Sequence, residues 1–164
     1  MALRLAQQGF AVTGWDIVPE AIDWARRKGR DRRIGANFEV VDMVSEIRGG
    51  GGFEVVLDDH CFHCIIGDDR KIFLRNVRSS LKQKGIFVLR THCDDPPATM
   101  PEAVLKMWDP MSRCQVFGGV AGRYMGRRSD ILREIEEAGF RLVEANVFEA
   151  RGEWPLLEAL FRVS

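Results

Sequence analysis

The stretch Gly9–Lys28, which reads GFAVTGWDIVPEAIDWARRK, determines how the rest of the sequence is interpreted. Its first part, Phe10–Trp15, is a short apolar segment that predicts a β-strand. Asp16 follows directly, and an amphipathic pattern over Pro19–Lys28 predicts a helix that begins at the proline. In an open α/β sheet, ligands bind beyond the carboxyl ends of parallel strands. A carboxylate at that position can accept hydrogen bonds from the two hydroxyl groups of a ribose.

The arrangement of a strand followed by an acid recurs further along the chain. Asn37–Val41 is rich in Phe and Val, and Asp42 follows it. Phe53–Leu57 is an almost continuous apolar run, which is typical of a buried strand, and it leads into Asp58-Asp59-His60. Because Asp16 and Asp42 lie about one βα unit apart, we expect them at the tips of neighbouring parallel strands.

The remaining segments extend the alternation of helices and strands. Gly49–Gly52 predicts a flexible turn, because it precedes a strand, whereas phosphate-binding loops follow one. The other predicted elements are, in chain order, a helix at Ala2–Gln8, a short helix at Met43–Ile47, a helix at Asp68–Lys82, a turn at Lys84-Gly85, a strand at Ile86–Leu89 that leads into Arg90-Thr91-His92-Cys93, a helix at Ile131–Ala138 capped by Ser129-Asp130, and an antiparallel pair at Phe140–Phe148 and Leu156–Val163.

Residues 94–128 differ from the rest because prolines and glycines are concentrated there. We interpret them as an irregular insertion on the substrate side with one short helix at Glu102–Trp108, since long connections at the binding edge of a sheet often carry function. Its aromatic, methionine and arginine side chains are candidates for contacting an acceptor, although exposed arginines are also common on solvated surfaces. These residues are Met107, Trp108, Arg113, Arg123, Tyr124, Arg127 and Arg128.

Length and composition narrow the classes of protein. The 164 residues predict a single domain over 1–164, and the zero formal net charge provides no global basic field for a nucleic-acid partner. No apolar run approaches the length that spans a membrane. Four cysteines at low density predict reduced thiols and a cytoplasmic location.

The order of elements, a doubly wound α/β sheet that ends in a hairpin, resembles the class I S-adenosylmethionine-dependent methyltransferases. The likeness rests on three segments: Gly9–Ile22, Phe53–Ile65 and the hairpin after Glu136-Glu137-Ala138-Gly139-Phe140. It implies a Rossmann-like, mostly parallel sheet with a C-terminal antiparallel hairpin, S-adenosylmethionine as cofactor and a small-molecule methyl acceptor.

The resemblance also implies roles for single residues. Asp16 would bind the ribose and Ile17 would pack on the adenine. The alternative role for Asp16 is an ordinary helix cap, and the matching Asp42 favours the ribose role. Asp42 would lie near the adenine amino group with Met43 beside it. Asp58, at the end of the next strand, would border the methionine part of the cofactor.

Methyl transfer requires alignment of donor and acceptor, and at most a weak base. A methyl sulfonium is already activated, so the protein mainly orients the reactants and excludes water. Asp59, His60 and His92 are the candidate catalytic residues, because a carboxylate or imidazole at the strand edge can reach an acceptor proton.

The sequence departs from the family in one respect. The family's first strand and its acidic, glycine-rich loop, which brings backbone N–H groups to the cofactor carboxylate, would come before Ala2. That strand would lie between the strands that end at Asp16 and Asp58. We therefore expect an N-terminally truncated methyltransferase that binds its cofactor poorly.

Two alternatives remain open. His60, Cys61, His63 and Cys64, together with His92-Cys93, could hold a structural zinc ion, since zinc accepts mixed thiolate and imidazole ligands. The chain could also be a non-catalytic, methyltransferase-like binding or oligomerisation module. The sequence does not specify an oligomeric state, and a homo-oligomer is one option.

Overall fold

The computed structural model describes residues 1–45 and 52–164. The chain forms two compact units, Met1–Ile47 and Arg48–Ser164, and each is described by itself. The interpretation of residues 1–164 as one methyltransferase-like domain stays a prediction. The end of the predicted helix at Met43–Ile47 and most of the glycine run at 49–52 lie outside the described residues. No helix within the described ranges combines the length and apolarity needed to cross a membrane.

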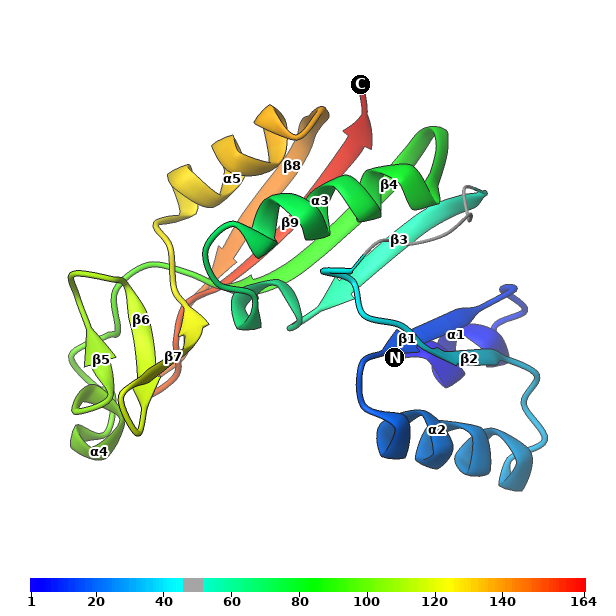
Figure 1. The fold of residues 1–164 in the computed structure, drawn as a ribbon, viewed down its shortest axis with the longest axis horizontal. Helices are drawn as coiled ribbons and strands as arrows, with labels where there is room; N and C mark the ends of the chain where they lie inside the picture. The colour runs from blue at the N-terminus through cyan, green and yellow to red at the C-terminus, as the bar shows by residue number, and fades with distance from the viewer. Residues whose placement is uncertain (46–51) are drawn as a thin grey trace. The chain divides into compact units, whose positions relative to one another are not determined.

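The first unit is a pair of parallel strands with helices packed against it (Figure 1). Gly14 lies so close to Phe38 that a Cβ atom there would approach the phenyl ring to 2.8 Å, which explains a glycine inside a strand. Ile22 is buried and anchors the longer helix. The elements are α1 (Ala2–Gln7), β1 (Thr13–Asp16), α2 (Pro19–Asp31) and β2 (Asn37–Val40).

Several boundaries in this unit differ from those predicted. α1 and β2 each end one residue earlier, at Gln7 and Val40, and β1 includes Asp16. β1 begins at Thr13 instead of Phe10, and Phe10 is 62% exposed. α2 continues past Lys28 to Asp31, because its last turn carries the basic residues that complement the negative end of a helix. The described part of Met43–Ile47 is a turn and not a helix.

The second unit is built on a four-stranded sheet in the order β3-β4-β9-β8. β3 and β4 are parallel, whereas β9 runs antiparallel to both β4 and β8, so the C-terminal hairpin is confirmed with its predicted bounds. Its elements are β3 (Phe53–Asp59), the 3₁₀ helix η1 (Phe62–Cys64), α3 (Asp69–Ser80), β4 (Leu81–His92), α4 (Glu102–Leu105), β5 (Trp108–Asp109), β6 (Cys114–Phe117), β7 (Val120–Tyr124), α5 (Arg128–Glu137), β8 (Phe140–Phe148) and β9 (Leu156–Val163).

Helices α3 and α5 cover the same face of this sheet (Figure 1). The core between them consists of alternate strand positions and the apolar stripes of the helices, each large side chain contributing about 1.5–3 kcal/mol when fully buried. The phenyl rings of Phe87 and Phe140 lie 5.5 Å apart between their centroids, and those of Phe62 and Phe73 lie 5.4 Å apart. The other fully or nearly fully buried members are Leu74, Val77, Leu89, Ile131, Ile135, Leu157 and Phe161.

Several expectations for this unit need correction. β4 covers Leu81–His92 and is longer than the predicted strand Ile86–Leu89. β3 extends to Asp59, so Asp58 and Asp59 belong to the strand and do not follow it. The helix expected to reach Lys82 ends at Ser80. The turn predicted at Lys84-Gly85 is an irregularity within β4, where the pairing with β3 passes from Leu81 to Ile86.

A further correction concerns residues 94–128. They are not an irregular loop, since α4 is followed by the antiparallel sheet β5-β6-β7 around a small core of Met100, Met125 and Trp154. The predicted cap of α5 is also different. The Asp94 carboxylate, and not Ser129, accepts the backbone N–H of Arg128 at 2.8 Å.

Arg70 on α3 joins several elements of the second unit. Its guanidinium is 6% exposed and pairs with Glu134 of α5, with Nη2 to Oε2 at 2.7 Å. Its Nη1 donates to the carbonyl oxygens of Phe62 and Ile65, and the cation lies 3.7 Å from the centroid of the Phe62 ring. Removing the partners of a charge buried in this way lowers the free energy of unfolding strongly.

Replacing Arg70 should therefore destabilise the protein strongly. We expect Arg70→Met to lower the free energy of unfolding by about 3 kcal/mol, because the Glu134 charge and two carbonyl groups lose their partner. Lys71→Met, on the same helix, is the matched control. Its ion pair with Asp68 is exposed to solvent, so we expect little change in the free energy of unfolding. Urea unfolding followed by circular dichroism measures both. Equal effects of the two substitutions would contradict the role of Arg70.

Candidate functional site

Asp16 and Asp42 both lie just at or beyond the carboxyl ends of the parallel strands β1 and β2, as predicted. Asp16 stands opposite Val40 in the register, two residues before Asp42. Oδ1 of Asp16 accepts the backbone N–H of Val18 at 2.9 Å, and Oδ2 has no hydrogen-bond partner among the described residues. The neighbouring Ile17 side chain is 60% exposed. The capping function of Asp16 is therefore present, and one carboxylate oxygen still faces outward.

Asp42 is held in a tight turn. Its Oδ1 accepts the backbone N–H of Val44 at 3.0 Å, and its Oδ2 accepts the Ser45 hydroxyl at 2.6 Å. These hydrogen bonds lower the pKa of Asp42, so the carboxylate stays ionised at neutral pH. Met43 follows in the same turn and is half-buried.

The second unit places the other predicted residues at the carboxyl ends of β3 and β4. Asp58 is buried, with Oδ1 accepting the backbone N–H of Cys61 at 3.0 Å. Its Oδ2 is buried without a partner among the described residues. Burial raises the pKa of Asp58 to about 6, so this carboxyl group is poised to change protonation state near neutral pH.

Asp59 and His60 form a hydrogen-bonded pair that is anchored to the sheet. Nδ1 of His60 lies 3.0 Å from Oδ1 of Asp59, which also binds Nη1 of Arg90 at 3.1 Å. Arg90 in turn donates to Glu158 on β9 at 2.7 Å. His60 has a left-handed backbone (φ 73°), and its N–H donates to the Arg90 carbonyl, so the loop is held in an unfavourable conformation by strand pairing.

A carboxylate on Nδ1 fixes the role of an imidazole. When Asp59 accepts the Nδ1 proton of His60, Nε2 is left as the basic nitrogen. The carboxylate also stabilises the imidazolium that forms after a proton is taken up. This pair therefore has the geometry of an oriented general base.

All three histidines of the chain lie in one cluster at this edge. The ring centroids of His63 and His92 are 4.9 Å apart, and the His60 ring lies 5.8 Å from His63 and 5.2 Å from His92. His63 is a member that the sequence interpretation did not assign to catalysis. Its position on η1, directly after β3 and beside the end of β4, was the available signal.

The cluster holds its inner imidazoles neutral. Burial is the main cause that lowers the pKa of His63 to about 3. Repulsion between imidazolium charges within the cluster and the positive charges of Arg123 and Arg70 act in the same direction. Burial, His60 and Arg123 also lower the pKa of His92, and the backbone of Pro155 and Trp154 opposes this in part. Nδ1 of His92 is buried and has no hydrogen-bond partner among the described residues. Both rings are therefore neutral at physiological pH.

The zinc alternative is not supported. Within residues 1–45 and 52–164, no group of three or more His, Cys, Asp and Glu side chains is arranged to hold a metal ion. Cys93 is buried beside Asp94, and burial raises the pKa of its thiol to about 12, which disfavours the thiolate that zinc requires. Cys64 is exposed and its thiol lies 3.8 Å from the His60 carbonyl oxygen.

Comparison with known families identifies the fold and its general chemistry. A family model described as a methyltransferase domain matches residues 1–85, just over half of the 164 residues. The chain belongs to this methyltransferase family. Its α/β architecture is that of the class I S-adenosylmethionine-dependent methyltransferases, as the resemblance implied. S-adenosylmethionine is the cofactor, and S-adenosylmethionine-dependent methylation is the general activity.

Solved structures share the fold. An S-adenosylmethionine-dependent methyltransferase from Methanosarcina mazei has a TM-score of 0.78 and 16% identity, over 99% of this chain and 86% of that one. A structure on the conversion of a disulfide bond into a thioacetal group during echinomycin biosynthesis has a TM-score of 0.76 and 24% identity, over 99% and 70%. Magnesium protoporphyrin IX methyltransferase from Synechocystis PCC 6803, with bound S-adenosylhomocysteine, has a TM-score of 0.70 and 19% identity, over 99% and 68%.

Three of the seven candidate acceptor residues of the insertion are engaged in contacts within the second unit. Trp108 packs on Trp154 with ring centroids 5.4 Å apart. Arg113 donates to the Met125 carbonyl and pairs with Asp95 at 3.1 Å. Arg128 binds Asp94 at 2.6 Å.

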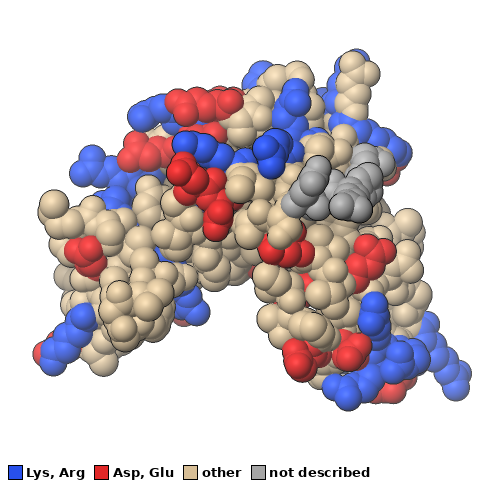
Figure 2. Space-filling view, viewed as in Figure 1, with Lys and Arg blue, Asp and Glu red and all other residues tan. Residues whose placement is uncertain are grey.

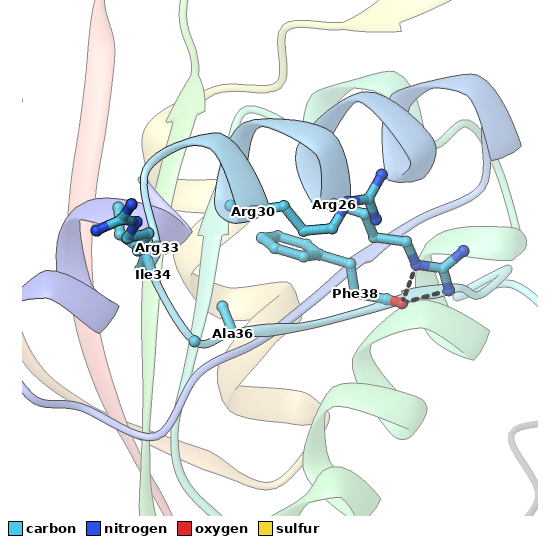
Figure 3. A pocket seen from close by; sticks show the side chains of 8 residues that line it. Arg26, Arg30, Arg33, Ile34, Ala36 and Phe38 are labelled. Atoms are coloured by element: carbon cyan, nitrogen blue, oxygen red, sulfur yellow. Dashed lines mark hydrogen bonds between the residues drawn. The ribbon is translucent and has the colours of Figure 1, made fainter.

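The first unit also contains a basic pocket of about 340 Å³ at the amino end of β2. Figure 2 shows Lys and Arg side chains gathered over α2, and Figure 3 shows arginines arranged around the ring of Phe38. Nε and Nη2 of Arg26 both donate to the Phe38 carbonyl, at 3.1 and 2.6 Å. Since Asp42 follows the carboxyl end of β2, this pocket lies at the opposite end of that strand from Asp42. Its other charged lining residues are Arg30 and Arg33.

The neutral state of His63 should make the methyltransferase sensitive to acid. Below its ordinary pKa of 6.5, the unfolded chain binds a proton at His63 that the folded protein does not bind until about pH 3. Stability is therefore lost as pH falls from 6.5. We expect the wild type to lose about 1 kcal/mol more than His63→Asn between about pH 7.5 and about pH 5.5 in urea unfolding. Asp58, with its raised pKa, acts in the opposite direction in both proteins and cancels in the difference. Identical pH profiles would show that His63 is protonated in the folded state.

Proposed function

We propose that this methyltransferase transfers a methyl group to a small-molecule acceptor at the carboxyl ends of β3 and β4, with His60 as general base. The observation that carries this proposal is the Asp59–His60 pair, fixed by Arg90 and flanked by two further imidazoles. When bound, S-adenosylmethionine supplies a methyl sulfonium, which accepts a nucleophile at its methyl carbon. The protein then has to orient the acceptor, exclude water and hold the acceptor's proton.

The residues of the first unit fit the adenosine part of the cofactor. Oδ2 of Asp16 faces outward at a strand tip and can accept hydrogen bonds from ribose hydroxyls. Ile17 presents an exposed apolar surface directly after it, which suits the face of an adenine ring. Asp42 remains ionised and rigid, so it can accept a hydrogen bond from an amino group, with Met43 beside it. In the second unit, Asp58 is the residue assigned to the methionine part.

The three candidate catalytic residues divide their tasks. His60 takes the proton on Nε2, because its Nδ1 is turned to the carboxylate. Asp59 orients the ring and stabilises the imidazolium, and its bond to Arg90 keeps this carboxylate in place. His92 lies beside His60 as a neutral ring that can hydrogen-bond the acceptor.

Efficient cofactor binding requires an additional strand. Within the described residues, β1 pairs only with β2, and β3 pairs only with β4 on one side. Val55 and Leu57 on β3 are 50% and 37% exposed, which is high for apolar residues of a parallel strand. Such edges favour pairing with a further strand. A strand followed by a glycine-rich loop could pair with these edges, and we propose that the cofactor binds poorly to the 164-residue chain without such a segment.

Two broader expectations accompany this function. Four free cysteines suit a reducing compartment, so a cytoplasmic location stays our prediction. A homo-oligomer is compatible with the proposal.

Cofactor binding tests the role of Asp16. We expect Asp16→Asn to weaken S-adenosylmethionine binding by about tenfold or more, since charge-assisted hydrogen bonds to the ribose are lost. Asp23→Asn is the control, because Asp23 is an exposed acid on α2 that pairs with Arg26. Isothermal titration calorimetry is performed on the 164-residue chain and on a chain extended by the upstream coding sequence. The extended chain should bind more tightly. Micromolar binding by the shorter chain would contradict the truncation proposal, and equal binding by Asp16→Asn would contradict the ribose contact.

Measurement of the turnover rate tests the role of His60 as general base. We expect His60→Gln to reduce kcat by about 100-fold or more, while cofactor affinity is unchanged, because proton removal is lost and not binding. Asp59→Asn should give a smaller loss and shift the pH–rate profile. S-adenosylhomocysteine formation with an acceptor library measures the rate. Cofactor binding without any turnover by the extended wild type would favour the non-catalytic module.

A further inference from the structure

Two cysteines that follow β3 face solvent, whereas the two residues between them do not. Cys61 and Cys64 are exposed, while Phe62 and His63 are buried. Cysteine is ordinarily among the most buried residue types, and both other cysteines of the chain follow that tendency. Since no metal-binding arrangement exists among the described residues, the Cys-x-x-Cys spacing requires another explanation.

The backbone between the two cysteines is a single 3₁₀ turn. The N–H of Cys64 donates to the carbonyl oxygen of Cys61 at 2.8 Å, and Cys61 directly precedes η1. A 3₁₀ helix has three residues per turn and rises about 2.0 Å per residue, so residues three apart project in the same direction with Cα atoms about 6 Å apart. Disulfides join Cα atoms that lie about 4.4–6.8 Å apart. The turn therefore brings the two thiols within disulfide-forming range, on the side that faces solvent.

Hydrogen bonds to neighbouring elements hold this turn in place. The N–H of Cys61 donates to Oδ1 of Asp58 at 3.0 Å. Nη1 of Arg70 donates to the carbonyl oxygens of Phe62 and Ile65, at 3.0 and 3.2 Å. Because these bonds use backbone groups and not the sulfur atoms, the turn keeps its shape when the thiols react.

We propose that Cys61 and Cys64 form a reversible dithiol–disulfide site, which is oxidised by a small disulfide of the glutathione class. A Cys-x-x-Cys pair within a βαβ unit is typical of redox-active dithiols, and β3, α3 and β4 form that unit here. The cross-link would close a segment of only four residues, so it restricts the unfolded chain little and adds little stability. Exposed disulfides of this kind are the labile ones. The site does not require the proposed methyl transfer.

The oxidation is a pair of thiol–disulfide exchanges whose atoms and electrons balance. The thiolate of one cysteine attacks a sulfur of the small disulfide, the S–S bond breaks, and one small thiolate leaves. The thiolate of the other cysteine then attacks the protein sulfur of the mixed disulfide, and the second small thiolate leaves. The two cysteine protons end on the two released thiols. The protein loses two electrons and the small disulfide gains them, and an excess of a dithiol reverses the reaction.

Oxidation also removes a contact of His60. The thiol of Cys64 donates to the carbonyl oxygen of His60 at 3.8 Å, and a disulfide sulfur has no proton to donate. The left-handed backbone of His60 (φ 73°) depends on contacts of this kind. His63 lies within the cross-linked segment, with its ring centroid 5.8 Å from that of His60. The state of the two sulfur atoms therefore affects the histidine cluster.

Thiol labelling of the 164-residue protein tests the site. The protein is equilibrated with mixtures of reduced and oxidised glutathione, the remaining thiols are alkylated with N-ethylmaleimide in urea, and peptides are mapped by mass spectrometry. We expect all four cysteines to be labelled in excess reduced glutathione. In excess oxidised glutathione, Cys61 and Cys64 should lose their label and appear as one internal disulfide. Dithiothreitol should restore the labelling of both.

Single variants distinguish the internal disulfide from simple modification of an exposed thiol. Cys64→Ser should form no internal disulfide and should keep a glutathione adduct on Cys61. Cys93→Ser is the control, because Cys93 is buried and its thiol donates to Asp94, which a serine hydroxyl can also do. It should leave the Cys61–Cys64 disulfide unchanged. A stable glutathione adduct on the wild type, a disulfide between two chains, or full labelling in oxidised glutathione would overturn the inference.

The imidazole spectrum tests the effect on the cluster. Because the chain has only three histidines, a carbon–proton spectrum of the imidazoles shows the cluster alone. We expect the disulfide to shift the signals of His60 and His63, and dithiothreitol to restore them. A disulfide that leaves these signals unchanged would refute the link to the cluster. Calorimetry of S-adenosylmethionine binding is measured separately, so failure of the redox site and failure of the methyl-transfer proposal are distinguishable.

Discussion

The parallel pairing of β3 with β4 is the constraint on which the site depends. This register sets Asp59 opposite Arg90, and it lets the N–H of His60 donate to the Arg90 carbonyl. Both strands end at the same edge, so residues 32 positions apart in the chain come into contact there. The left-handed backbone of His60 persists because this pairing and the bond to Asp59 outweigh its conformational cost. Without the strand pair, the imidazoles would have no common location.

The four-stranded sheet in turn depends on how the second unit buries charge. Arg70 is an unusual residue for a core position, since its guanidinium lies between α3 and α5. It is tolerated because Glu134, two carbonyl oxygens and the face of Phe62 together replace water. The same cation lies within range of His63 and helps to keep that ring neutral. Arg70 therefore contributes both to the packing of the second unit and, as one of several causes, to the lowered pKa of His63.

The insertion shows that a segment of poor local regularity can be well defined in three dimensions. Residues 94–128 form a small antiparallel sheet whose core includes Trp154 from the turn of the C-terminal hairpin. Asp94 caps α5 from a position 34 residues away, and Trp154 donates its indole N–H to the Asp94 carbonyl. Arginines that look like acceptor contacts in the sequence, Arg113 and Arg128, are used for structural bonds of this kind.

The sequence by itself determined the elements whose signals are local. Amphipathic spacing identified α2, α3 and α5, and apolar alternation gave the hairpin strands Phe140–Phe148 and Leu156–Val163 with their bounds. The order of strands and acids placed Asp16 and Asp42 on neighbouring parallel strands, because βα units have a strong topological rule. Only the tertiary structure decided the insertion of β9 between β4 and β8, the remote cap of α5 and the membership of His63 in the cluster. Each of these depends on contacts between residues far apart in the chain, and such contacts leave no periodic pattern that a single sequence can reveal.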